Sequence, residues 1–230
     1  MPVWGLAATL ALAVFAFLLG QVVGVEALAA ARSFRPNVNP DAAALTMATL
    51  VADPVQTITL ILAARLTGSD ANAYFGLFMP RKRDVAIALA ALAAAIVLGD
   101  LLTLALGRDV VPAFQLDMFR SVQGEGALVW LLLDIVLVAP TCEELMFRGF
   151  LFRGLIREPR ENLPGILLIA LLWSLLHIQY DWLGVALVFA IGVLFGYVRL
   201  YTGSTLLVIL LHMLLNLESV VETFFVLGWL

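Results

Sequence analysis

The sequence has one cysteine, two histidines and few charged residues. Cys142 stands alone in 230 residues, so the chain can form neither an intrachain disulfide nor a cage of thiolate ligands. Charged residues make up 13% and the net charge is −4, which provides no basic stripe for nucleic acid. The sequence therefore argues against a disulfide-stapled secreted fold, a zinc ribbon and a nucleic-acid-binding protein.

Apolar residues are what the chain has in excess. Its 63% hydrophobic residues and mean hydropathy of +1.05 lie far outside soluble composition. Runs of about 18 to 25 apolar residues can cross a hydrocarbon core roughly 30 Å thick. We predict an all-α, polytopic membrane helical bundle of about seven transmembrane helices. Segment 109–125 is expected to be a loop, with room for a short interfacial helix or an eighth element. The seven expected spans are 3–25, 43–66, 84–107, 126–150, 163–180, 183–201 and 205–228.

No linker or low-complexity tract divides the chain. We therefore expect a single transmembrane domain over 1–230, with a catalytic core in 126–228. Asp53-Pro54 interrupts the second span, and proline removes a helical hydrogen bond. A kink or a broken helix, packed against protein rather than lipid, is expected there.

Basic residues are unequally divided between the links on one side of the membrane and the links on the other. The positive-inside rule places the links with more Lys and Arg in the cytoplasm. It predicts a cytoplasmic N-terminus, and the compact size suggests a prokaryotic plasma membrane. Nine basic residues fall in or near the links after spans two, four and six: Arg65, Arg81, Lys82, Arg83, Arg148, Arg153, Arg157, Arg160 and Arg199. Four fall in the opposite links: Arg32, Arg35, Arg108 and Arg120.

Acidic and imidazole side chains occur inside the predicted spans. Glu143 and Glu144 are adjacent in "TCEELMF", and His177 and His212, the only histidines, lie in two later spans. One ionised side chain at the centre of a membrane helix costs about 2.5–3.5 kcal/mol, so such residues usually mark a functional site. At 1.5 Å per residue, Glu143 and His177 each lie roughly 21 Å from the predicted cytoplasmic end of their helix. His212 lies roughly 12 Å and Asn216 roughly 18 Å from the same end of the last helix. The overlapping depths predict one polar pocket.

Helical spacing assigns directions to these side chains. Glu144 and Arg148 are four residues apart and can form an ion pair, whereas Glu143 points about 100° away and can face another helix. His212 and Asn216 also share a face. We assign Glu143 to chemistry and Glu144 with Arg148 to its support, although the spacing also fits the reverse assignment.

This set of residues is suited to hydrolysis of an amide bond. Glu143 can take a proton from water, and the resulting hydroxide attacks a carbonyl carbon. His177 can orient that water. His212 and Asn216 can donate hydrogen bonds to the developing oxyanion.

Three short motifs resemble one family. "EELMFR", "WSLLH" and "HMLLN" are similar to the EExxxR, FxxxH and HxxxN motifs of the CAAX prenyl protease and bacteriocin-processing (CPBP or ABI) family of intramembrane endopeptidases. The resemblance covers about 137–216, and Trp173 stands where the family more often has Phe. It implies water activation by Glu143 and His177, oxyanion contacts from His212 and Asn216, and structural or assisting roles for Glu144 and Arg148.

Two alternatives remain at this point. In the first, Glu143, His177 and His212 hold zinc. Asn216, one turn after His212, is a poor zinc ligand and a good oxyanion donor, so we favour metal-independent chemistry with no cofactor. In the second, a transporter, bacteriocin-immunity protein or scaffold uses the polar cluster without catalysis. The leading hypothesis is an endopeptidase that cleaves peptides or prenylated or lipidated peptides near the cytoplasmic side of the bilayer.

Four further residues with polar side chains lie outside the three motifs. Asp134 lies about 13 Å along the helix from Glu143, too far for direct cooperation, and is expected to pair with another helix or line water. Cys142 is expected to pack. Glu218 and Glu222 approach the far interface or the pocket.

Overall fold

The computed structural model describes residues 4–34 and 42–230, and every regular element in these ranges is helical. The prediction of an all-α membrane bundle is confirmed. The α-helices outside the central part of the chain are α1 (Leu6–Phe34), α2 (Ala42–Leu66), α3 (Ala71–Phe75), α4 (Lys82–Ala105), α5 (Ala113–Gly124), α9 (Asn162–Ser174), α10 (Trp182–Thr202) and α11 (Thr205–Leu227).

A continuous helical run of mixed type fills the middle of the molecule. We call it the central run; π-helical turns interrupt it twice. Its pieces are α6 (Leu128–Leu133), the π-helix η1 (Asp134–Val138), α7 (Ala139–Glu144), the π-helix η2 (Leu145–Leu151) and α8 (Phe152–Leu155). π-turns inside helices often occur at functional sites.

Five of the described helices are long and apolar enough to cross a membrane: α1, α2, α4, α10 and α11. The chain is therefore an integral membrane protein. The other two expected spans take a different form. Span 126–150 is the interrupted central run, and span 163–180 is the 13-residue α9 followed by a 3-10 turn, η4 (Leu175–His177). Segment 109–125 contains a short helix, α5.

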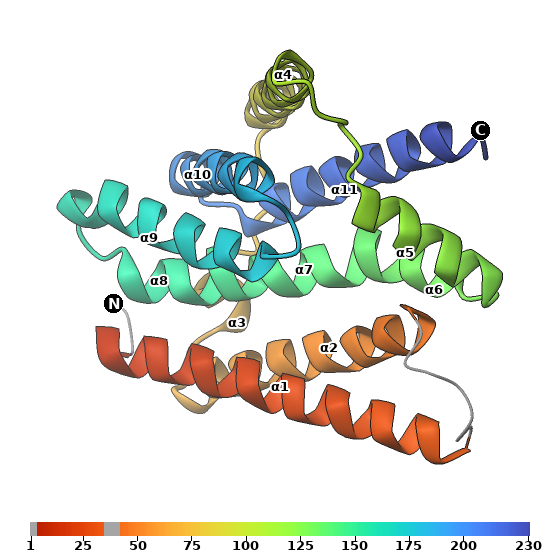
Figure 1. Ribbon diagram of the computed structural model, residues 1–230. Coiled ribbons are helices and arrows are strands. Elements are labelled where there is room, and N and C mark those ends of the chain that lie inside the picture. Colours follow the sequence, from red (N-terminus) through yellow and green to blue (C-terminus); the bar gives the residue numbers. More distant parts are fainter. Residues whose placement is uncertain (1–3, 35–41) are drawn as a thin grey trace.

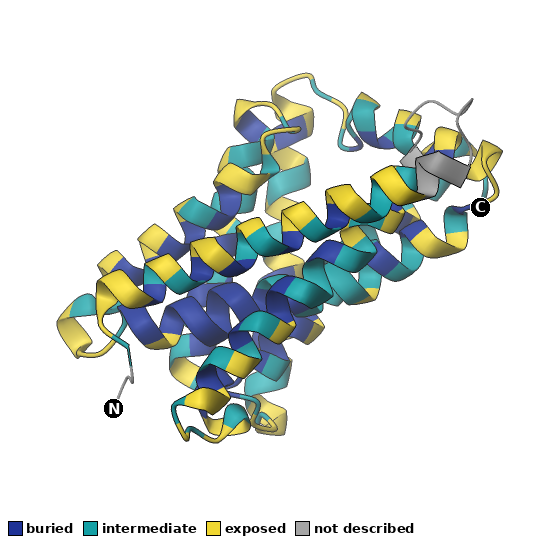
Figure 2. Cartoon of the chain, turned by 90° about the horizontal axis from the view of Figure 1, so that it is seen from below, coloured by how far each residue is buried: buried dark blue, intermediate teal, exposed yellow. Residues whose placement is uncertain are grey.

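The helices surround the central run (Figure 1). The α1–α2 pair lies along one side of it, while α9, α10 and α11 lie along the other, with α4 outermost. All seven residues of η2 are buried, whereas α1 exposes an apolar stripe of Phe15, Leu18, Val22 and Val25. Figure 2 shows this contrast between the dark core and the exposed outer face of α1. Such a stripe fits contact with lipid.

The break expected at Asp53-Pro54 is absent, because α2 continues through Pro54. The expected packing against protein is present, since Ala52 is buried beside α1. Gly20 and Gly24 permit this approach. A Cβ at Gly20 would lie 2.6 Å from the Ala52 carbonyl oxygen. Helix α2 thus packs closely against α1 beside its proline.

Hydrogen bonds between links define the two ends of the bundle. At one end, Arg157 Nη2 donates to the Trp4 carbonyl at 3.0 Å, joining the N-terminus to the link after α8. At the other, Arg108 forms an ion pair with Asp181, joining the link after α4 to the start of α10. We call the first the basic end, because α2 ends and α4 begins there with Arg65, Arg81, Lys82 and Arg83.

Two of the counted basic residues are not link residues. Arg148 is fully buried and Arg199 is only 8% exposed, because both side chains bond to backbone inside the bundle. Without these two, the links after spans two, four and six hold seven basic residues and the opposite links hold four. The distribution of basic residues therefore still favours the same orientation. Arg35 lies outside the described residues, as does the segment 35–41 around it.

Candidate active site

A buried ion pair forms the base of the candidate site. Glu144 and Arg148 are both 0% exposed, and Arg148 Nη1 lies 3.0 Å from Glu144 Oε1, as the spacing predicted. Arg148 Nη2 donates to the Gly192 carbonyl at 3.0 Å. Gly192 therefore has two roles: a Cβ there would lie 3.0 Å from Ala170 Cβ, so the glycine permits close helix packing, and its carbonyl anchors Arg148.

His212 bonds to the same glutamate. Its Nδ1 lies 2.9 Å from Glu144 Oε1, so Nδ1–H donates to the carboxylate and Nε2 remains for other contacts. The ring is 3% exposed and lines the cavity described below. The sequence did not predict this contact, because only the tertiary structure brings α11 against the central run.

Glu143 faces a different helix from Glu144. Its Oε2 accepts a hydrogen bond of 2.6 Å from Trp173 Nε1 on α9. The expectation that Glu143 turns away from the Glu144–Arg148 pair is confirmed. Trp173 thus makes direct contact with the proposed base.

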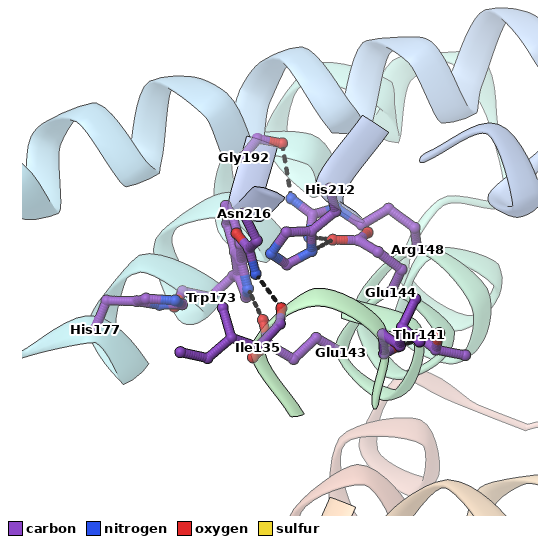
Figure 3. Close-up of polar contacts among 11 residues, drawn as sticks. Ile135, Thr141, Glu143, Glu144, Arg148, Trp173, His177, Gly192, His212 and Asn216 are labelled. Atoms are coloured by element: carbon purple, nitrogen blue, oxygen red, sulfur yellow. Dashed lines mark hydrogen bonds and ion pairs between the residues drawn. The ribbon is translucent and has the colours of Figure 1, made fainter. Parts of the chain in front are cut away.

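His177 lies at the edge of the group. Its Nδ1 is 3.0 Å from the Trp173 carbonyl oxygen, an acceptor, so Nδ1 carries the proton and Nε2 holds a free lone pair. Figure 3 shows Trp173 between His177 and Glu143. Within the described part of the chain, His177 and Glu143 share no hydrogen bond, so any joint action requires a molecule between them.

Asn216 is bonded to a backbone group that a π-turn leaves unpaired. Its Nδ2 donates to the Ile135 carbonyl at 2.8 Å. In η1 the N–H of Ala139 bonds to the Asp134 carbonyl, five residues back. The next π-type partner for Ile135 would be the nitrogen of Pro140, which has no hydrogen. The asparagine side chain therefore replaces a missing backbone donor.

A cavity of about 910 Å³ adjoins these residues. Trp173, His177, His212 and Asn216 line it, whereas Glu143 lies behind the Trp173 indole and is outside the lining. The lining includes five acids and one basic residue: Asp100, Asp109, Asp181, Glu218, Glu222 and Arg108. Glu218 and Glu222 thus belong to the cavity.

The two other polar residues behave as expected. Asp134 Oδ2 accepts a hydrogen bond of 2.5 Å from Thr49 of α2, so this acid pairs with another helix. Cys142 is a buried free thiol packed within the central run.

The proposed zinc ligands are not gathered in this arrangement. Among the described residues, three metal-binding side chains bring their ligand atoms within 4.8 Å of one another only at Asp100, Glu218 and Glu222. Glu143, His177 and His212 form no such group, and Trp173 lies between two of them (Figure 3). The three residues do not fit a tetrahedral zinc site here.

Comparison with known proteins identifies the segment that holds this geometry. A family described as type II CAAX prenyl endopeptidase Rce1-like matches residues 125–217. We call residues 125–217 the Rce1-like segment because of their similarity to this family. The match includes all six candidate residues and confirms the resemblance noted from the motifs, over less than half of the chain. No curated protein and no solved structure matches.

The Rce1-like segment consists of the central run, α9, α10 and the first half of α11. Helices α1, α2 and α4 lie outside it. They contribute the packing of α2 on the central run and the α4 wall of the cavity.

Proposed function

We propose that the Rce1-like segment is the active site of an intramembrane endopeptidase that hydrolyses a peptide bond in a peptide or a prenylated or lipidated peptide. One observation carries this proposal. Within the matched segment, His177, His212 and Asn216 line a single 910 Å³ cavity in the bundle, and Glu143 is bonded to Trp173, which lines the same cavity.

Glu143 supplies the base in the proposed reaction. Its Oε2 is occupied by the Trp173 indole, and no hydrogen bond to Oε1 occurs in the described part of the chain. Oε1 is therefore available to take a proton from water. The free Nε2 of His177 accepts a hydrogen bond from the same water and orients it. The hydroxide formed attacks the carbonyl carbon of the scissile bond.

His212 and Asn216 stabilise the oxyanion that results. Asn216 keeps one amide hydrogen beyond the one given to Ile135. His212, whose Nδ1 is bonded to Glu144 at 2.9 Å, can donate from Nε2 only when both ring nitrogens carry hydrogen. The oxyanion collapses, the C–N bond breaks, and Glu143 returns its proton to the leaving amine.

We propose that this chemistry needs no metal. The support is the poor ligand quality of Asn216 and the separation of Glu143 from His177. Strong chelation should leave peptide cleavage within about twofold of the untreated rate. A loss on chelation that zinc restores would favour the zinc alternative.

We propose a prokaryotic plasma membrane with the basic end and the N-terminus in the cytoplasm. The expectation of cleavage near the cytoplasmic side does not fit this orientation. Links 107–114 and 179–181 of the cavity lie at the end opposite the basic end, because α4 and α11 run away from it. A substrate then enters from the non-cytoplasmic face or from the bilayer. A cytoplasmic substrate requires the inverse orientation.

The test is proteolysis in proteoliposomes with a panel of prenylated and unprenylated fluorogenic peptides. Wild type should cleave at least one peptide, and Glu143→Gln and His212→Ala should lose at least about 100-fold in rate. Glu158→Gln, in an exposed ion pair with Arg160, is the matched control and should match wild type. Cleavage that survives in folded Glu143→Gln would overturn the assignment of the base.

A further inference from the structure

Trp173 contacts the proposed base, both histidines and the buried arginine. Its Nε1 donates to Glu143 at 2.6 Å. Its ring centroid lies 5.1 Å from that of His177 and 5.3 Å from that of His212, both edge to face. The Arg148 guanidinium carbon lies 4.6 Å from the same centroid.

These contacts fix the indole in one orientation. Trp173 is 2% exposed, Arg148 packs over its ring, and Phe195 lies 6.1 Å away between centroids. The attraction between a cation and the face of an indole is strongest when both are desolvated, as they are here. Rotation of the ring would break that contact and both histidine contacts, so the N–H vector has a single direction.

The indole N–H and the carboxylate satisfy each other. A buried Trp N–H requires an acceptor, and a carboxylate at membrane depth requires a donor. A phenylalanine at position 173, which the CPBP motif more often has, would keep the ring contacts but could not donate. The hydrogen bond to Glu143 therefore depends on the tryptophan of this sequence.

We infer that Trp173 is a positioning residue for the base: its Nε1–H holds Oε2 of Glu143 so that Oε1 is presented to the water. The inference rests on the proposed function. A carboxylate with one oxygen fixed keeps a defined geometry towards the attacking water, and misplacement of a reacting group by 1 Å can cost about 100-fold in rate.

The contact itself is tested by NMR of protein labelled with ¹⁵N in its five indoles. The Trp173 signal is the one lost in Trp173→Phe. In Glu143→Ala, which removes the acceptor, this Nε1–H signal should move upfield and exchange faster with solvent. The other four indole signals should stay in place. An unchanged Trp173 signal would overturn the contact whatever the activity of the protein.

The catalytic role is tested by kinetics of Trp173→Phe in the proteoliposome assay. We expect kcat to fall roughly 10-fold with KM within about twofold, because the base is misplaced and the cavity wall is kept. Trp130→Phe is the matched control, since Trp130 is 48% exposed on α6 and should behave as wild type. A Trp173→Phe enzyme with wild-type kcat would overturn the inference and leave the endopeptidase proposal intact. If wild type cleaves nothing while the NMR contact is present, the proposed function fails, and the positioning role fails with it.

Discussion

Asn216 Nδ2 donates to the Ile135 carbonyl oxygen at 2.8 Å. The bond joins α11 to the first π-turn of the central run, 81 residues earlier in the chain. It exists because Pro140 has no N–H to offer that carbonyl. A helical irregularity thus sets the position of a proposed oxyanion donor.

Pro140→Ala should lower activity without lowering stability. An alanine supplies the missing N–H, which then competes with Asn216 for the Ile135 carbonyl and lets the amide shift. We expect kcat to fall roughly 10-fold, less than the 10²–10³ for removal of an oxyanion donor. Pro54→Ala, the same change inside α2, is the control and should keep wild-type kcat. Equal kcat in both variants and wild type would refute the link between Pro140 and Asn216.

The buried ion pair should contribute far more to stability than an exposed one. Arg148→Met leaves Glu144 at 0% exposure without its main partner, and loss of one member of a buried pair costs about 3–5 kcal/mol. Arg160→Met, at an exposed pair with Glu158, should cost at most about 1 kcal/mol. Reversible unfolding in detergent measures both. Equal losses would mean that the pair contributes little net stability.

Cysteine labelling on intact cells tests the orientation. In a Cys142→Ala background, Arg160→Cys places a thiol in the link at the basic end, and Asp117→Cys places one on the exposed face of α5 at the other end. With a cytoplasmic N-terminus, a membrane-impermeant maleimide should label position 117 and should reach position 160 only after lysis. The reverse result would turn the cavity towards the cytoplasm, where a CAAX-type substrate could enter it.

The charge of the cavity should favour basic peptides. Five carboxyl groups and one guanidinium line it, and that guanidinium, of Arg108, is already paired with Asp181. Charge pairs near a protein surface contribute on the order of 1 kcal/mol, so a lysine-containing peptide should have roughly fivefold lower KM than its glutamate counterpart. Glu222→Gln and added salt should both reduce the difference. Equal KM values for the two peptides would show that these acids do not affect substrate binding.

The sequence by itself determined the membrane class, five of the seven expected spans and the identities of the polar residues. Apolar runs of sufficient length fix the spans, and the four-residue spacing of Glu144 and Arg148 fixes their ion pair, since both depend only on local helical geometry. The same geometry correctly turned Glu143 towards another helix.

Tertiary structure decided the partners that lie across helices. Helical periodicity states which way a side chain points, but not which helix it meets or at what height. The contacts of His212 with Glu144 and of Trp173 with Glu143 depend on how α11 and α9 pack on the central run. Sequence periodicity does not predict the π-turn at Asp134 either, because that turn shifts the hydrogen-bond register by one residue. The sequence identified the polar residues inside the bundle, and packing determined which of them touch.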